Sequence, residues 1–385
     1  MTQGQDIIVI GGGISGTSAT YELAKRGAHV TLVEREQLHA MASGWTLAGV
    51  RQSGRLAPEL PIAQAAIRRW EHLAEELGAD LEYRQAGNLR LALNEDEVPI
   101  IRRVVEDGVA AGIPMEYIDA AHVRELAPIV TDQVVGASFC PTDGHANNHL
   151  AVTAYADAAT RLGATIRTGT EVTGLIVNGD RVSGVHTTAG DLHADIVIVA
   201  AGVYTPRLLA PLGLQLPLQV VLCPIFTTEP TDPVLAPVLG VADATFAGRQ
   251  EASGRLRLIG VDRSFPWTED QHTPGNTMPT TSSTEHMIRN AIRVLPAVAD
   301  LRVDRIWGGL IDRTPDVLPV IERSPAYEGL VIAAGFSGHG FGIGPATGEI
   351  LADLATTGAS RFDLSAFTLD RFRTGVAQAK LEMHG

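Results

Sequence analysis

The sequence predicts an α/β protein built from two interleaved domains, and three observations support this prediction. Residues 6–33 have the pattern of a strand, a glycine-rich turn, a helix and a strand, which is typical of a parallel βαβ unit. A second glycine-rich junction lies near the other end of the chain, at residues 335–344. Between the two junctions, short strands rich in Val and Ile and a tight turn at residues 178–180 favour a mixed or antiparallel sheet.

Composition excludes several classes of protein. The chain has 30 Lys and Arg against 44 Asp and Glu, a net charge of −14, which disfavours nucleic acid and anionic membranes as partners. Its two cysteines, Cys140 and Cys223, lie far apart, so a disulfide framework or a cysteine-based zinc site is not expected. No apolar run reaches the length of a membrane span, and the N-terminus lacks a signal pattern. The expected location is therefore the cytoplasm.

The elements follow in order from periodicity and glycine stops. We expect strands at residues 6–10, 29–33, 84–93, 134–140, 165–167, 172–177, 181–186, 196–200, 220–227, 255–261 and 329–333. We expect helices that end at residue 26, that span 61–77, 97–111, 150–162 and 285–294, and one that Pro345 opens. The polar segment 264–284 contains three prolines and is predicted to be a surface loop.

The first glycine-rich junction has the pattern of a dinucleotide-binding fingerprint. Gly11, Gly13 and Gly16 would allow a tight turn, a close approach of a pyrophosphate and close packing of helix on strand. The N-terminus of the following helix offers free N–H groups to the phosphates. Glu34, at the end of the second strand, is placed to accept hydrogen bonds from a ribose, which disfavours NADP.

The rest of the chain favours FAD over NAD. An NAD dehydrogenase would continue with regular parallel βα repeats, and an enzyme with two dinucleotides would carry a second complete fingerprint near the middle. Neither pattern is found in the sequence. One dinucleotide that stays bound is the simplest interpretation, and a flavin fits it. An NAD dehydrogenase remains an alternative.

The sequence resembles the superfamily of FAD-dependent D-amino-acid oxidases and sarcosine oxidases, most closely the sarcosine oxidase group and its β-subunit-like members. The resemblance covers nearly the whole chain. It is carried by Gly11–Gly16 with Glu34 and Arg35, by Asp143–Asn147, by Val199–Gly202, by Trp307–Asp316 and by Gly335–Gly344. The resemblance implies a Rossmann-like FAD-binding domain at residues 1–84, 145–214 and 311–385, and a substrate-binding domain at 85–144 and 215–310.

The resemblance also implies which residues bind FAD. In chain order these residues are Gly11, Gly13, Ile14, Ser15, Gly16, Glu34, Arg35, Ala42, Ser43, Gly44, Ala48, Gly49, Val50, Val172, Ala201, Gly202, Gly338, His339, Gly340, Phe341, Gly342 and Ile343. The last six would lie along the pyrimidine side of the flavin, where a glycine-rich helix start directs N–H groups at the negative charge of the reduced ring.

Four positions depart from the patterns of the relatives. Gly309 and Thr46 stand where some relatives attach flavin through Cys or His, so we predict FAD that is not covalently bound. Gly342 stands where sarcosine oxidases have a lysine for the substrate carboxylate, and Ile311 where D-amino-acid and glycine oxidases have an arginine.

Three residues remain as candidates for the substrate side of the site. Arg51 matches an arginine that binds the substrate carboxylate in sarcosine oxidases, although a salt bridge at the surface or one that supports the flavin is an alternative role. His339 would line the substrate face or support the flavin structurally, and Trp307 would form a wall of the pocket or part of the core.

The resemblance implies oxidation of the C–N bond of an amine or amino acid, with a secondary or N-alkyl amino acid preferred, by hydride transfer to flavin to give an imine. The electrons would pass to oxygen or to a partner, and the chain could form homo- or hetero-oligomers. Two alternatives stay open: the flavin subunit of a heteromeric amino-acid dehydrogenase, and a non-catalytic flavoprotein that serves as a binding module.

Overall fold

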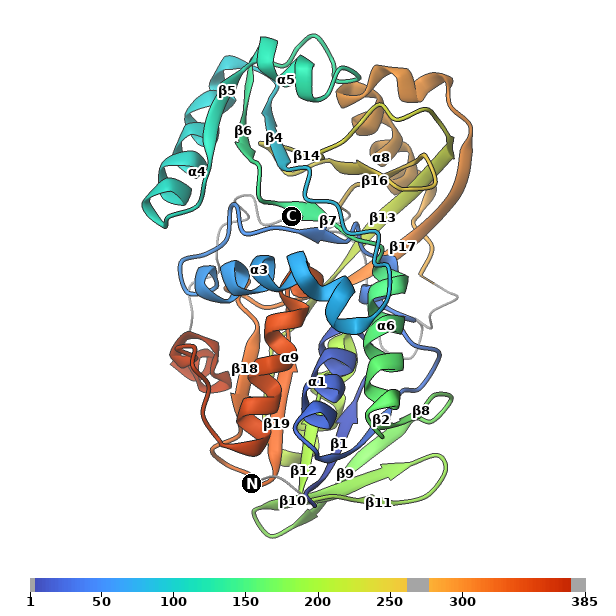
Figure 1. The fold of residues 1–385 in the computed structure, drawn as a ribbon, viewed down its shortest axis with the longest axis vertical. Coiled ribbons are helices and arrows are strands. Elements are labelled where there is room, and N and C mark those ends of the chain that lie inside the picture. The colour runs from blue at the N-terminus through green and yellow to red at the C-terminus, as the bar shows by residue number, and fades with distance from the viewer. Residues whose placement is uncertain (1–3, 262–276, 375–385) are drawn as a thin grey trace.

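The computed structural model describes residues 4–261 and 277–374, and its largest elements are two β-sheets that lie end to end (Figure 1). The first sheet has six strands, in the order β18, β19, β12, β1, β2 and β8. Five of them are parallel, and only β18 at one edge runs antiparallel to its neighbour. The strands span β1 (Asp6–Ile10), β2 (His29–Val33), β8 (Thr165–Arg167), β12 (Ile196–Val199), β18 (Val320–Arg323) and β19 (Leu330–Ala334).

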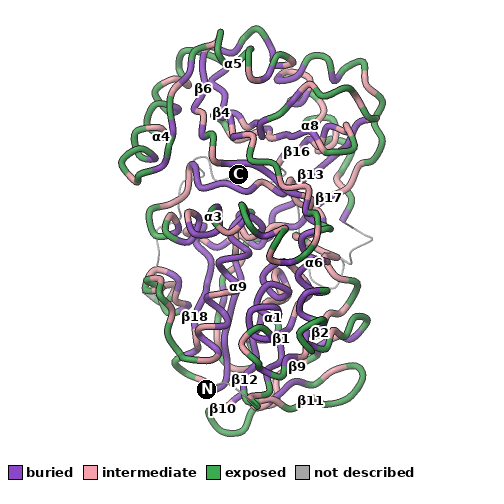
Figure 2. The backbone as a smooth tube through the Cα atoms, viewed as in Figure 1, coloured by how far each residue is buried: buried purple, intermediate pink, exposed green. Residues whose placement is uncertain are grey.

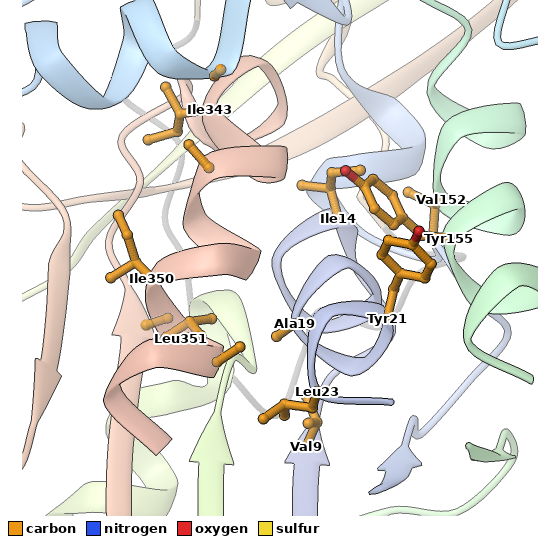
Figure 3. Close-up of a cluster of buried hydrophobic side chains, with 14 of the residues drawn as sticks. Val9, Ile14, Ala19, Tyr21, Leu23, Val152, Tyr155, Ile343, Ile350 and Leu351 are labelled. Carbon is orange, nitrogen blue, oxygen red and sulfur yellow. The ribbon is translucent and has the colours of Figure 1, made fainter. Parts of the chain in front are cut away.

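The central strands are runs of Val, Ile and Ala because both faces of this sheet are covered. One face carries the helices α1 (Ile14–Lys25), α6 (Asn148–Arg161) and α9 (Gly340–Thr356), and α3 (Leu60–Leu77) packs across α9. Their apolar side chains form the core shown in Figure 3, where Ile14 and Leu23 of α1 lie between α9 and α6. Buried residues accordingly follow these helices and strands through the middle of the layer (Figure 2).

The other face of the first sheet packs on a small three-stranded sheet of β9 (Val172–Asn178), β10 (Arg181–Thr187) and β11 (Leu192–His193). The turn between β9 and β10 contains Gly179 at φ +65°, a conformation that glycine adopts without strain. The predicted hairpin at residues 178–180 is therefore confirmed.

The second sheet has eight strands, in the order β17, β13, β16, β15, β14, β4, β6 and β5. It is antiparallel except where β14 runs parallel to β4. The strands span β4 (Asn88–Ala92), β5 (Glu116–Asp119), β6 (Gly136–Cys140), β13 (Gln219–Pro230), β14 (Val238–Val241), β15 (Ala247–Gln250), β16 (Arg255–Ile259) and β17 (Val303–Arg313). The helices of this half are α4 (Val98–Ala110), α5 (Ala120–Leu126) and α8 (Thr281–Val294).

The chain crosses between the two halves several times. A two-stranded sheet of β3 (Gly49–Val50) and β7 (Gly144–His145) lies where they meet, and β7, β13 and β17 are labelled there in Figure 1. The short helix α2 (Ala42–Trp45) contacts β17. Helix α7 (Thr205–Leu209) follows β12. The predicted fold class is confirmed: an α/β protein with a Rossmann-like sheet and an interleaved, mixed second sheet. The domain boundaries of the sequence analysis remain a prediction.

Two helix starts were predicted wrongly. Helix α9 begins at Gly340, and Pro345 lies inside it instead of opening it. Tertiary contacts override the poor helix propensity of this glycine-rich stretch, because the Trp70 indole donates to the Gly342 carbonyl at 2.8 Å and Gly344 packs tightly on Ile14.

Helix α8 begins at Thr281, within the segment predicted to be a loop, because the Thr280 hydroxyl caps it by accepting from the Ser283 amide at 3.1 Å. Of the segment 264–284, residues 264–276 lie outside the described part of the chain.

Candidate functional site

A large cavity lies where the two sheets meet, and residues from both sheets line it. The first sheet contributes the glycine-rich loop after β1, the ends of β2 and β12, and the segment before α9. The second sheet contributes residues of β4, β13, β14, β16 and β17. Ligands of α/β proteins bind at the carboxyl ends of parallel strands, and the cavity occupies that position.

The glycine-rich loop has no room for side chains. Gly11 has φ +111°, and a Cβ atom there would lie 2.3 Å from the Ala200 carbonyl oxygen. A Cβ atom on Gly16 would lie 1.9 Å from the Gly11 carbonyl oxygen. The backbone is thus bare on the cavity side and tightly packed beneath. The loop leads into the N-terminus of α1, where N–H groups and the helix dipole favour a pyrophosphate.

Glu34 is fixed next to this loop. Its two carboxylate oxygens accept hydrogen bonds from the amides of Gly12, at 2.6 Å, and Glu36, at 2.8 Å. The neighbouring Arg35 places its guanidinium 4.1 Å from the centre of the Tyr204 ring. Both residues line the cavity at the end of β2, the position expected for the contacts with a ribose and an adenine.

The segment around α2 is held against the cavity by α6. The Asn148 side-chain amide donates to the carbonyls of Ser43, at 2.9 Å, and Gly44, at 2.8 Å, while the Ser43 hydroxyl accepts from the Ile14 amide at 3.0 Å. His149 contacts the Gly44 carbonyl at 2.9 Å. These bonds tie the segment to the glycine-rich loop, so that one wall of the cavity is continuous.

The segment before α9 forms the facing wall. The buried Asp312 carboxylate accepts a hydrogen bond from the Gly335 amide at 2.8 Å. Burial raises the pKa of Asp312 to about 6, although hydrogen bonds from the backbone amides of Gly335 and Phe336 oppose the rise. Gly338 has φ +92° and packs against Ile311. The wall is thus a backbone surface whose shape depends on glycine.

Fifteen of the predicted FAD-binding residues line the cavity: Gly11, Gly13, Ile14, Ser15, Glu34, Arg35, Ala42, Ser43, Gly49, Val172, Ala201, Gly202, Gly338, Gly340 and Phe341. The others lie behind this surface: Gly16, Gly44, Ala48, Val50, His339, Gly342 and Ile343. Gly44, for instance, is pressed against the His39 carbonyl, where a Cβ atom would lie only 1.9 Å from the oxygen.

The three candidates for the substrate side have different positions. Arg51 lines the cavity. His339 is buried behind the cavity, with its Nδ1 atom 3.3 Å from the Glu59 carboxylate, and burial lowers the pKa of His339. Trp307 lies on β17 beside the guanidinium groups of Arg257 and Arg305, at 5.2 and 5.3 Å from its ring centre, and it does not line the cavity.

The loop that carries Arg51 is fixed by the fully buried Asp143. This carboxylate accepts from the amides of Gln52, at 2.8 Å, and Ser53, at 3.3 Å, and from the Ser53 hydroxyl. The Arg51 guanidinium donates to the Ser53 carbonyl at 3.1 Å. Burial, and then the charges of Arg55 and Arg90, lower the pKa of Arg51.

Sequence reasoning missed Arg55 and Arg90, which also line the cavity. Arg55 stands four residues after Arg51, and this spacing was an available signal. Arg90 lies on β4 in the second sheet, and nothing near it in the sequence points to the site. Asp143 belongs to the segment Asp143–Asn147, which carried the resemblance but received no role of its own.

No helix within residues 4–261 and 277–374 is both long and apolar enough to cross a membrane.

Comparisons with known proteins identify relatives along almost the full chain. A family model described as DAO, FAD dependent oxidoreductase, matches residues 6–354. The chain is 29% identical over 381 residues to the sarcosine oxidase subunit beta of Arthrobacter sp, covering 96% of this chain and 91% of that protein. It is 28% identical over 381 residues to the glycine oxidase of Geobacillus kaustophilus, covering 96% and 98%. Its fold is similar to the crystal structure of L-proline dehydrogenase from P. horikoshii, with a TM-score of 0.89, 28% identity and coverage of 98% and 100%.

Proposed function

Because the chain belongs to the DAO family of FAD-dependent oxidoreductases, we propose that it oxidises the C–N bond of a secondary or N-alkyl amino acid to an imine. The coarser activity follows from the family: the protein is an FAD-dependent oxidoreductase that acts on amines or amino acids. Preference for a secondary amine is supported by two similar proteins, which are named for sarcosine and L-proline.

The residues of the cavity fit FAD. At Gly11 a Cβ atom would overlap the Ala200 carbonyl, so this turn accepts only glycine and leaves bare backbone for a pyrophosphate. Glu34 and Arg35 would hold the adenosine end, and the segment before α9 would lie along the flavin. Bound FAD supplies the two-electron acceptor for the oxidation of the C–N bond. We propose that it is held without a covalent bond, since Gly309 and Thr46 line the cavity where relatives carry attachment residues.

The observation that carries the proposal is the position of Arg51. Its guanidinium is buried in the cavity wall, on a loop that Asp143 fixes, and a guanidinium group is well suited to bind a substrate carboxylate. A carboxylate held there would orient the Cα–H and C–N bonds of the substrate. The nearby charges of Arg55 and Arg90 would disfavour a protonated amine, so the substrate would react as the neutral amine without a strong general base.

The experiment is an anaerobic flavin-reduction screen of the purified protein with N-methyl, cyclic, D- and L-amino acids. Oxidised flavin absorbs at about 450 nm, and the proposal predicts that this band bleaches with at least one secondary amino acid. A protein that lacks the band, or a band that no amine bleaches, would contradict it. The second outcome would instead support a non-catalytic flavoprotein.

Substitution of Arg51 tests its role directly. Arg51→Ala should raise KM strongly while FAD remains bound, because it removes the carboxylate contact. Arg302→Ala is the matched control, since the Arg302 side chain is 88% exposed. An unchanged KM in Arg51→Ala would show that another residue holds the carboxylate.

A second candidate is the flavin subunit of a heteromeric dehydrogenase, which the similarity to a sarcosine oxidase β subunit favours. In this case the substrate would reduce the flavin of the isolated chain, but the reduced flavin would form little hydrogen peroxide in air. Steady peroxide formation by the isolated chain would instead identify an oxidase that needs no partner.

A further inference from the structure

Three guanidinium groups line the half of the cavity that faces the second sheet. Arg51 lies in the loop after β3, Arg55 lies just before α3, and Arg90 lies on β4. Arg51 and Arg90 are 8% and 6% exposed, and Arg55 is half-buried. Arginines are seldom buried in a protein, so three in one wall indicate a demand for positive charge at this place.

The three groups are close enough to act on one another. Burial is the largest cause that lowers the pKa of each, and the charge of Arg55 adds to the effect on both Arg51 and Arg90. The carboxylates of Glu59 and Asp143 oppose the effect on Arg51 and Arg55. For Arg90 the pKa falls to about 10. An anion bound between these groups would offset their mutual repulsion.

One hydrogen-bond donor of the Arg55 guanidinium indicates a ligand. Its Nε atom donates to the Arg51 carbonyl at 3.4 Å, which holds the side chain beside Arg51. Its Nη1 atom is buried, and no hydrogen-bond partner for it is found within the part of the chain that the structure describes. A buried donor of this kind is unfavourable until an acceptor reaches it.

The surrounding wall is otherwise mostly apolar. Val238, Leu239 and Gly240 of β14 line it beside Arg90, together with Asn88. Arg90 lies next to β14, because β4 and β14 are paired with Arg90 opposite Gly240. This region therefore suits a short hydrocarbon segment that ends in a charged oxygen group.

One carboxylate does not account for all three arginines. It has about four lone-pair sites, enough for two guanidinium groups that each bind through two donors. Arg51 follows β3, whose Gly49 lies against Gly342 in the first turn of α9, whereas Arg90 comes from the second sheet. We propose that the substrate is an amino acid with two carboxylates, of which Arg51 binds the one next to the amine and Arg55 and Arg90 bind the other. This inference rests on the proposed function, and it defines the substrate class of the same site.

The test compares substrates that differ by one carboxylate. N-methylalanine is paired with N-methylaspartate, and N-methyl-2-aminobutyrate with N-methylglutamate. The ratio of kcat/KM for the dicarboxylate over its partner should exceed about tenfold in the wild type, since hydrogen bonds between charged groups are among the strongest in proteins. Arg55→Gln and Arg90→Gln should each lower this ratio about tenfold or more. Arg302→Gln, an exposed control, should leave the ratio unchanged.

A binding measurement separates this inference from the proposed function. Glutarate has two carboxylates but no amine, and butyrate has one carboxylate. The inference predicts that glutarate raises the Tm of the FAD-loaded protein more than butyrate does, and that Arg55→Gln removes the difference. This comparison needs no turnover, so it remains valid if no amine reduces the flavin and the proposed function fails. Equal kcat/KM within each pair, or equal Tm shifts, would overturn the inference. If Arg90→Gln does not fold, the kcat/KM ratio of the wild type and its change in Arg55→Gln still test the inference.

Discussion

His145 should make the protein sensitive to mild acid. This residue of β7 is 2% exposed, and its Nδ1 atom lies 3.2 Å from Nη1 of Arg249. A guanidinium has donors only, so Nδ1 must be the acceptor and the imidazole must be neutral. Burial, followed by the charges of Arg249 and Arg84, lowers the pKa of His145 to about 2. Protonation would remove the acceptor and place two positive charges side by side.

The size of the effect follows from proton linkage. In the unfolded chain a histidine has a pKa of about 6.5, so below this pH the unfolded state binds one proton that the native state does not. The contribution of His145 to stability is fully present above pH 6.5 and is lost as the pH falls. At about 1.36 kcal/mol per pH unit, acidification from about pH 6.5 to about 5.0 lowers the free energy of unfolding by roughly 2 kcal/mol.

Urea unfolding of the FAD-loaded protein at these two pH values measures the loss. In His145→Asn the side-chain amide oxygen takes the place of Nδ1 and can accept the hydrogen bond from Arg249. Asparagine does not titrate in this pH range. The variant should therefore lose about 2 kcal/mol less than the wild type on acidification. His193→Asn is the matched control, because His193 is exposed on β11 and should behave as the wild type does. If His145→Asn and the wild type lose the same stability, the neutral buried imidazole is refuted.

Three further predictions concern the cofactor site. Gly16→Ala places a Cβ atom 1.9 Å from a backbone oxygen. Overpacking of this kind lowers stability by about 1–3 kcal/mol. The variant should therefore purify with less FAD and have a lower Tm. Gly174→Ala is the control, because its Cβ atom would lie 3.7 Å from the nearest atom, and it should keep the wild-type FAD content and Tm. Equal FAD content in the two variants would contradict the packing argument. Trp70→Phe removes the donor to the Gly342 carbonyl and should lower the free energy of unfolding by about 1–3 kcal/mol and speed FAD release, measured by flavin fluorescence. Acid precipitation of the protein should leave the flavin in the supernatant, because we expect no covalent bond. Cys223 is a buried thiol in the cavity wall. If flavin precipitates with the wild type but not with Cys223→Ser, the flavin is bound covalently to this thiol.

Local signals in the sequence predicted the strand–turn–helix unit that we expect to bind the nucleotide. The strand, the glycine-rich turn and the acid at residue 34 lie within one βαβ unit, and such a unit is specified by residues near one another in the chain. The start of α9 was predicted wrongly because Trp70 and Ile14, which stabilise its first turns, lie far away in the sequence. Local propensity contains no information about contacts of this kind.

The substrate side was less predictable for the same reason. Arg51 was found through a resemblance, whereas Arg90 reaches the cavity only because β4 pairs with β14 and β6. These partner strands lie about fifty to one hundred and fifty residues farther along the chain. A single arginine in a strand has no feature that distinguishes a cavity residue from a surface residue until the sheet is assembled.

The strand order of the first sheet also determines when the cofactor can bind during synthesis. The glycine-rich loop follows β1, which pairs with β2 and β12, whereas the facing wall of the cavity, the segment before α9, is made only after residue 334. At roughly 5–20 residues per second, a ribosome needs on the order of half a minute to add the intervening stretch. Until β19 is made, β12 lacks one of its two partner strands, and the apolar surface on that side of the sheet is exposed. The nascent chain therefore depends on protection from aggregation until its last third emerges, and FAD can stabilise only the nearly finished protein.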